Sequence, residues 1–301
     1  MKRLTELLIV LTCAALTSAS GEQPRSTAFD LQGNVIFVKA SIGNSQPLDM
    51  ALDSGTKRTT LDQAVAVELG LDLSLKAQSS GARGMQEVSV IKDQTLRLCG
   101  VDLTEPMMIS YPLEFLSKRI GRRVDGIIGV ELLHRYVVEI DYPAHQIRIL
   151  APEAFTYAGS GQVVPVTYDQ RLPLISGSVT LFGRSSIPVR FQVDTGGASS
   201  YVMFWKGFIE KHDLAVGTRG LRAVQVTSFG GTTTQKQGHV QAIQIGKIVV
   251  TDPEVGLNDF QYGDPSVFDA NLGSAFLKQF KVIFDLPHDR IILEQPAASR
   301  P

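Results

Sequence analysis

Apolar and polar residues alternate along most of this chain, in short runs that end at turn-forming residues. The clearest runs are residues 34–42, 137–141 and 146–150, and two longer stretches, 77–99 and 221–245, each have glycines near the middle. Alternation with a period of two indicates half-buried β-strands. Many short strands separated by glycine-rich turns predict a mostly β, barrel-like architecture.

Few segments predict helices. Residues 62–69 have an acidic start and stop at Gly70, which is typical of a short helix, and residues 132–135 predict a single helical turn. The stretch 152–162 contains Gly159-Ser160-Gly161 and is the predicted linker between two parts of the chain.

The hydrophobic pattern occurs twice. Residues 48–55 read LDMALDSG and residues 189–196 read VRFQVDTG, an offset of 141 positions. A second pair of segments, 125–133 and 269–277, aligns without a gap at an offset of 144 positions. This period is far above that of solenoid repeats, so the chain is predicted to consist of two homologous lobes. We place them at residues 28–151 and 163–295.

Composition agrees with a globular protein of this size. The chain has 301 residues, of which 44% are hydrophobic and 20% charged, and its formal net charge is −1. A balance so close to neutral argues against a nucleic-acid partner. Lys118, Arg119, Arg122 and Arg123 form a local basic cluster, which we interpret as a solvated loop.

The first 20 residues have the pattern of a secretory signal peptide. Lys2 and Arg3 precede an apolar stretch at 7–16, and small residues follow it. The stretch is too short to span a bilayer comfortably, and no later segment reaches that length. We therefore expect an exported protein, periplasmic or extracellular. Cys13 lies in a weak lipoprotein-like context, so lipid anchoring there is the less favoured alternative.

Cleavage of that segment would leave Cys99 as the sole cysteine, without an intramolecular disulfide. Its position at the end of an alternating run predicts a buried, inert thiol. The histidines lack metal-ligand spacing, and the chain has neither a His-Glu-x-x-His run nor a Gly-x-Ser-x-Gly elbow. No metal or other cofactor is implied.

Each repeat ends in aspartate, then serine or threonine, then glycine. A single tripeptide of this kind more often caps a local turn, but two copies in matched context favour a functional pair, Asp53 and Asp194. Other acidic residues also recur. Asp125 and Asp269 precede apolar runs, which predicts structural turns. Asp141 and Asp285 each precede a residue and then a proline, which predicts hairpin corners.

On these residues the chain resembles the pepsin/retropepsin-like aspartic proteases. The similarity is greatest to bacterial exported proteins with two tandem retropepsin-like domains, and it covers roughly residues 29–294. In that family each Asp-[Thr/Ser]-Gly loop is braced by a later hydrophobic-hydrophobic-Gly segment. Ile127-Ile128-Gly129 and Leu272-Gly273 match that segment. The resemblance implies a bilobal acid-protease β-barrel fold with short helices.

The resemblance also implies roles for the residues around the aspartates. Asp53 and Asp194 would share a proton and activate water, because two carboxylates so close cannot both ionise easily. The residues that would support this dyad are Ser54, Gly55, Thr56, Thr195 and Gly196. The hairpin tips would act as flaps over a peptide substrate, and the flap candidates are Gly81, Gly84, Phe229, Gly230 and Gly231.

Two residues of the second lobe depart from the family pattern. Gly197 stands where the family has serine or threonine, so the hydroxyl partner of Asp194 is missing, and Ser199 or Ser200 is the candidate to replace it. Asn271 stands where the family has an aliphatic residue. The first flap candidate also lacks tyrosine. The sequence thus predicts an aspartic endopeptidase, active as a monomer that forms an intramolecular pseudo-dimer. The alternatives are a catalytically weak peptide-binding module on the same fold and a structural protein of the cell envelope.

Overall fold

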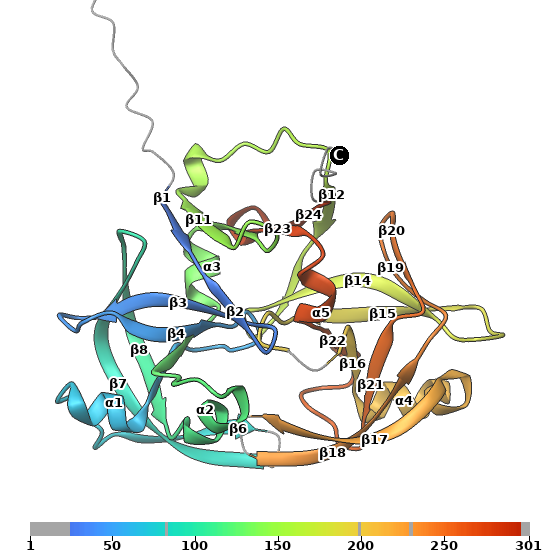
Figure 1. Cartoon of the computed structure of the whole chain (residues 1–301), viewed down its shortest axis with the longest axis horizontal. Helices are drawn as coiled ribbons and strands as arrows, with labels where there is room; N and C mark the ends of the chain where they lie inside the picture. Colours follow the sequence, from blue (N-terminus) through green and yellow to red (C-terminus); the bar gives the residue numbers. More distant parts are fainter. Residues whose placement is uncertain (1–24, 82–83, 198–199, 229–230, 296–301) are drawn as a thin grey trace, which may run out of the picture.

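The computed structural model describes residues 25–81, 84–197, 200–228 and 231–295, and its architecture is mostly β (Figure 1). The predicted signal peptide and Cys13 lie outside these residues. The described strands form three sheets, one in each lobe and a third that both lobes share. No helix in the described ranges has the length and apolar character needed to cross a membrane.

The first-lobe sheet has eight strands in the order β2-β3-β4-β9-β5-β8-β7-β6. Their bounds are β2 Asp30–Gln32, β3 Val35–Ile42, β4 Leu48–Leu52, β5 Thr60–Asp62, β6 Lys76–Gly81, β7 Gly84–Leu98, β8 Val101–Tyr111 and β9 Gly126–Ile128. The strand β4 pairs in parallel with β9, which brings the two sequence motifs of this lobe side by side.

The second-lobe sheet repeats this arrangement with ten strands. Their bounds are β13 Thr167–Asp169, β14 Leu172–Thr180, β15 Ser186–Val193, β16 Val202–Phe204, β17 Arg219–Ser228, β18 Gly231–His239, β19 Ala242–Ile245, β20 Ile248–Thr251, β21 Glu254–Asn258 and β22 Ala270–Leu272. Here β15 pairs in parallel with β22, as β4 does with β9. The repeated sequence thus produces a repeated topology.

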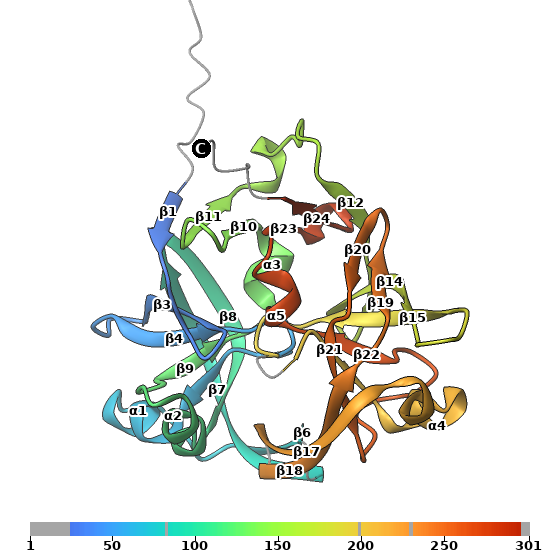
Figure 2. The same ribbon diagram turned by 45° about the vertical axis from the view of Figure 1, so that its right-hand side comes forward.

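A third sheet of six strands joins the lobes, and Figures 1 and 2 both show it on one side of the molecule, opposite the hairpins β6/β7 and β17/β18. Its strands are β1 Arg25–Ala28, β10 Val137–Asp141, β11 Gln146–Leu150, β12 Gln162–Pro165, β23 Lys281–Asp285 and β24 Arg290–Glu294. The antiparallel pairing of β10 with β23 crosses the lobe boundary, with Ile140 opposite Val282. The lobes are therefore held together by backbone hydrogen bonds in addition to side-chain packing.

The helices are short. They are α1 Gln63–Glu68, α2 Glu114–Ile120, α3 Glu131–Arg135, α4 Lys206–His212 and α5 Ser274–Leu277, with 3₁₀ turns η1 Pro152–Ala154, η2 Leu214–Gly217 and η3 Leu286–His288. Asp62 caps α1, because its carboxylate accepts hydrogen bonds from the amides of Ala64 and Val65. Helices α3 and α5 follow β9 and β22 at equivalent places and lie at the centre of the molecule, on the side of the six-stranded sheet (Figure 2).

One buried apolar cluster runs through both lobes and the shared sheet. It includes Met50 and Leu52 of the first lobe and Phe191 and Phe276 of the second, each 0% exposed. Burial of this much apolar surface is the main stabilising contribution, since the part of the chain that the structure describes contains only the free cysteine Cys99. The loops that follow β4 and β15 therefore rest on a continuous core.

Two features of the fold differ from the sequence-based interpretation. The basic cluster is not a solvated loop, since Lys118 and Arg119 belong to α2 and the Arg122 guanidinium pairs with Asp30 at 2.8 Å and with Asp49 at 2.5 Å. Cys99 is half-buried rather than buried, with a backbone φ of 53° in the β7–β8 turn. Burial still raises the pKa of its thiol, which disfavours the reactive thiolate.

Candidate active site

Asp53 and Asp194 lie at the ends of equivalent strands. Asp53 follows β4, and its amide donates to the Ile128 carbonyl at 3.0 Å; Asp194 follows β15, and its amide donates to the Leu272 carbonyl at 3.0 Å. The hydrophobic-hydrophobic-Gly segments therefore brace the aspartate loops through matched backbone hydrogen bonds. The parallel pairing fixes where each carboxylate emerges.

A reciprocal hydrogen-bond network joins the two loops. The Thr195 hydroxyl accepts from the Ser54 amide at 2.9 Å and donates to the Leu52 carbonyl at 2.9 Å. Conversely, the Ser54 hydroxyl accepts from the Thr195 amide at 3.0 Å and donates to the Val193 carbonyl at 2.8 Å. Both hydroxyl residues are at most 1% exposed, so this network is shielded from competing water. It fixes one loop relative to the other.

Asp53 receives two hydrogen bonds from its own loop. The Gly55 amide donates to Oδ1 at 2.7 Å, and the Thr56 hydroxyl donates to Oδ2 at 2.7 Å. Each places a donor on a carboxylate oxygen, and together they fix the orientation of the group. The roles implied for Gly55 and Thr56 are therefore consistent with the geometry.

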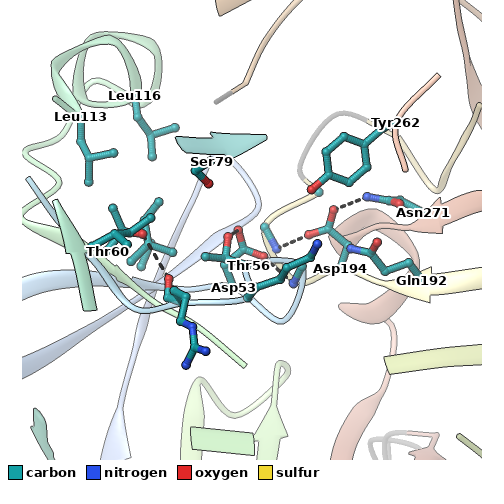
Figure 3. Close-up of a pocket in the computed structure, with 18 of the residues that line it drawn as sticks. Asp53, Thr56, Thr60, Ser79, Leu113, Leu116, Gln192, Asp194, Tyr262 and Asn271 are labelled. Atoms are coloured by element: carbon teal, nitrogen blue, oxygen red, sulfur yellow. Dashed lines mark hydrogen bonds between the residues drawn. The ribbon is translucent and has the colours of Figure 1, made fainter. Parts of the chain in front are cut away.

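Asp194 also receives two hydrogen bonds, although the residue after its loop is Gly197. The Gly196 amide donates to Oδ1 at 3.0 Å, and the Asn271 side-chain amide donates to Oδ2 at 2.6 Å. Ser200 does not substitute for the missing hydroxyl, since its own hydroxyl donates to the Val202 carbonyl at 3.0 Å; Ser199 lies outside the described residues. Figure 3 shows Asn271 reaching Asp194 from the neighbouring strand. The two departures thus compensate one another.

The glycine of each loop lies against the carboxylate of the other lobe. A Cβ added to Gly55 would come within 2.7 Å of Asp194 Oδ1, and a Cβ added to Gly196 would come within 2.5 Å of the Asp53 carboxyl. Any side chain there would force the carboxylates apart. Glycine is therefore required at both positions because the opposite carboxylate lies so close. Backbone conformation does not require it, since neither glycine has a positive φ.

Asp194 holds its proton unusually tightly. Burial, followed by the negative charge of Asp53 and by its hydrogen bond with the Asp53 side chain, raises the pKa of Asp194 well above its ordinary range. The hydrogen bonds from Asn271 and Gly196 act in the opposite direction but are smaller effects. Asp194 accordingly keeps its proton to higher pH than an ordinary aspartate does.

A cavity of about 680 Å³ opens above the pair. Its walls come from both lobes and from both hairpins, through Ser79 and Val88 of the first hairpin and Val226 and Thr233 of the second. Gly81 pairs with Gly84 at the tip of β6/β7, and Gly231 pairs with Ser228 near the tip of β17/β18; these are the flap candidates that the structure describes. Phe229 and Gly230 fall outside the described residues.

The other recurring aspartates have structural partners. Asp125 Oδ2 accepts from the Asp49 amide at 2.8 Å, and Asp269 Oδ2 accepts from the Arg190 amide at 2.8 Å, at equivalent places in the lobes. Asp141 accepts from the Ala144 amide at 2.9 Å in the β10–β11 turn. These contacts fit the turn and corner interpretations.

Sequence reasoning did not identify most of the cavity walls. Helix α2 contributes Leu116 and Arg119, and the segment after β21 contributes Phe260 and Tyr262. Neither region carries a repeat or a catalytic motif, so only the folded arrangement reveals it. The role of Asn271 was also missed, although the coincidence of a lost hydroxyl and a gained amide in one lobe was a usable signal.

Comparison with known families supports the same architecture. An aspartyl protease family model matches residues 38–132 and again residues 178–276, which together make up more than half of the chain. The two matches fall in the two lobes and include one aspartate loop each. No curated protein matches the chain.

Proposed function

Since the chain belongs to the aspartyl protease family, we propose that it is an endopeptidase that hydrolyses peptide bonds with Asp53 and Asp194 in one site per chain. The observation that carries the proposal is the hydrogen-bonded carboxylate pair at the floor of a cavity, with the pKa of Asp194 raised by burial and by Asp53. Such a pair supplies a base and an acid at the same pH.

The proposed reaction begins with a proton on Asp194, whose pKa is raised, and with Asp53 as the base. Ionised Asp53 takes a proton from a water molecule while the water oxygen attacks the substrate carbonyl carbon. At the same time, Asp194 gives its proton to the carbonyl oxygen. The resulting diol collapses when the amine leaves with the proton held by Asp53, while a diol hydroxyl returns a proton to Asp194. No bond forms between enzyme and substrate, and each carboxyl group recovers its starting state.

The donor from Asn271 supports an enzyme over a peptide-binding module. That alternative rests on the two second-lobe departures, Gly197 and Asn271, of which the missing hydroxyl at Gly197 would leave the outer oxygen of Asp194 without a donor. The 2.6 Å hydrogen bond from Asn271 supplies one. Asp53 and Asp194 therefore have equal numbers of hydrogen-bond donors within hydrogen-bonding distance.

The test is hydrolysis of a mixed peptide library between about pH 4 and pH 8, the range over which a shared carboxyl proton is expected. We expect cleavage within peptides, and a single turnover in H₂¹⁸O should label the new carboxyl terminus. Binding of peptides with no cleavage at any pH would contradict the proposal and favour the binding module. A covalently trapped intermediate would contradict the mechanism.

We further propose that the protein acts outside the cytoplasm as a monomer. The support is the signal-like pattern of the first 20 residues and the presence of both aspartate loops in one chain. Intact-mass analysis of protein from an exporting host should show a chain that starts near Ser20 or Gly21. A mass that retains the first 19 residues, or that includes lipid on Cys13, would contradict this.

A further inference from the structure

The cavity has a largely apolar wall in the first lobe, which also includes Arg119 of α2, and an amide-bearing wall in the second lobe. Ala51 pairs with Ile127 in the first lobe, and Gln192 pairs with Asn271 at the same register in the second. All four line the cavity. Figure 3 shows Gln192 and Asn271 on the side of Asp194, and the apolar Leu113 on the side of Asp53.

The neighbouring strands continue this difference. Ile109 of β8 and Gly256 of β21 occupy equivalent registers. The glycine leaves space that the Gln235 carboxamide fills, at 3.3 Å from where a Cβ on Gly256 would lie. Asn258 ends β21, pairs with Gln235 and lines the cavity. At the positions of Ala51 and Ile127, the second lobe therefore has the carboxamides of Gln192 and Asn271.

The polar atoms of this wall are buried and have no hydrogen-bond partner among the described residues. Those of residues that line the cavity are two donors, Trp205 Nε1 and Asn258 Nδ2, and two acceptors, Gln192 Oε1 and Asn271 Oδ1. Both amide atoms of Gln235, which pairs with Asn258, also have no partner among the described residues. Trp205, Asn258 and Gln192 are 6%, 5% and 1% exposed. Because buried polar groups are nearly always paired in folded proteins, this many in one wall indicates a hydrogen-bonding ligand. We call Trp205, Asn258, Gln192 and Asn271 the amide wall.

From these positions we propose that the amide wall is a specificity pocket for a side-chain carboxamide, so that the protein cleaves peptides with an asparagine or glutamine on one side of the scissile bond and an apolar residue on the other. The proposal rests on the proposed function, because it assigns substrate residues to the two sides of the same dyad. It follows from the chemistry of the wall, which offers donors and acceptors together, as a carboxamide does.

Charged and apolar side chains fit the amide wall less well. Met203, Phe260 and Tyr262 also line the cavity and are uncharged. Among the described residues, the cations of the lining are Lys57, Arg58 and Arg119 of the first lobe and Arg171 of the turn between β13 and β14. An acidic side chain would place a third carboxyl group beside the dyad. An apolar side chain would leave the donors and acceptors of the wall unpaired.

Binding can be measured without turnover by using peptides in which the scissile amide is reduced to a methylene-amine. We would compare asparagine with leucine, and glutamine with methionine, as near-isosteric pairs at the tested position, opposite a fixed leucine and in both orders. Fluorescence anisotropy gives Kd for each peptide. In one of the two orders, the carboxamide peptide should bind about tenfold or more tightly than its apolar partner.

Variants of the amide wall identify the residues responsible. Trp205→Phe retains an aromatic ring but removes the indole donor, and Asn258→Leu removes a donor while keeping similar volume. Each should bring the Kd of the apolar peptide divided by the Kd of its carboxamide partner closer to one. Gln244→Leu is the matched control, because Gln244 is an exposed amide in β19 of the same lobe and does not line the cavity. That control should leave the ratio unchanged.

The outcomes separate this inference from the proposed function. Equal Kd values within each pair, tighter binding of the apolar peptides, or no binding of any peptide would overturn the carboxamide pocket, since water alone would then satisfy the wall. Cleavage of the parent, unreduced peptides reports on the enzyme independently. Hydrolysis without a carboxamide preference would overturn the pocket alone. A carboxamide preference in Kd without hydrolysis would overturn the enzyme alone.

Discussion

Hydrogen-bond donors around a single carboxylate can be exchanged between distant positions of the chain. In the first lobe the outer oxygen of the aspartate accepts from Thr56 of the same loop. In the second lobe the equivalent oxygen accepts from Asn271, which lies 77 residues away in sequence but on the adjacent strand. Compared with the family motif, Gly197 and Asn271 are two separate departures. In the folded chain, however, the outer oxygen of each aspartate still accepts one hydrogen bond.

Removing that donor should shift the pH dependence of hydrolysis. In Asn271→Leu the hydrogen bond that lowers the pKa of Asp194 is lost, so the carboxyl pair holds its proton to higher pH. We expect the alkaline limb of kcat/KM to move up by about one pH unit, the equivalent of one hydrogen bond to a charged group.

Adding Gly197→Thr to Asn271→Leu provides the control. A Cβ at residue 197 would lie 3.1 Å from the Asp194 carboxyl, so a threonine hydroxyl there can reach its outer oxygen once Asn271 is gone. The double variant should recover part of the shift. An unchanged limb in Asn271→Leu would show that the amide does not contact the reacting carboxylate.

Gly55 and Gly196, each of which lies against the carboxylate of the other lobe, predict a graded loss of activity when they are replaced. Gly55→Ala and Gly196→Ala place a methyl group within 2.7 Å and 2.5 Å of the opposite carboxylate, closer than real Cβ contacts. Each should lower kcat by about 100-fold or more, as expected for a displacement of about 1 Å at reacting groups. Gly197→Ala, with a nearest contact of 3.1 Å, should lose less. Equal activity of all three variants in steady-state assays would contradict the geometry.

At the scale of elements, short loops and strand ends are held by buried polar groups whose partners come from other elements. The Ser54–Thr195 network lies between the ends of β4 and β15, and Glu131 ties the start of α3 to the loop before β5 through a 3.1 Å hydrogen bond from the Thr59 amide. Neither contact follows from local sequence pattern. Both make the positions of the site loops depend on the folded whole.

The loop network should contribute to stability cooperatively. Thr195→Val keeps the shape of the side chain but leaves the Ser54 amide and the Leu52 carbonyl without this partner. We expect a loss of about 1–3 kcal/mol in the free energy of unfolding, and a similar loss for Ser54→Ala. The double variant should lose less than the two single losses combined, because the hydroxyls act in one network. Additive losses in urea titrations would contradict that coupling.

Glu131 should make the fold less stable as the pH rises. Burial raises its pKa from 4.5 to about 7, so the folded chain keeps a proton that the unfolded chain releases between these values. The free energy of unfolding should therefore fall between about pH 4.5 and pH 7, by up to about 3 kcal/mol for a shift of this size. Glu131→Gln keeps an acceptor for Thr59 but does not titrate.

Denaturant titrations across that window test the assignment. Glu131→Gln should show a smaller decline with pH than the wild type, and the decline that remains belongs to groups such as Asp194, whose raised pKa acts in the same direction. A decline of equal size in both proteins would mean that Glu131 is not the group responsible.

At the scale of the molecule, the repeat in the sequence predicted most of what positions the site. The pairing of residues 48–55 with 189–196, and of 125–133 with 269–277, anticipated two lobes with one aspartate loop each, because duplicated segments fold alike. What the repeat could not reveal is where the lobes differ. Helix α2, the carboxamides at Gln192 and Asn258, and the donor from Asn271 depend on contacts between strands that no local pattern encodes.

The most direct test of the shared carboxylate pair is peptide hydrolysis by Asp53→Asn, by Asp194→Asn and by an equimolar mixture of the two. Removal of one of two close carboxylates relieves repulsion, so both variants should remain folded. Each should nevertheless be at least about 100-fold less active than the wild type, because one carboxylate cannot serve as both base and acid. The mixture should stay equally inactive, since both aspartates of a site belong to one chain. Near-wild-type turnover in either variant would contradict the dyad, and recovery of activity in the mixture would contradict a site built within a single chain.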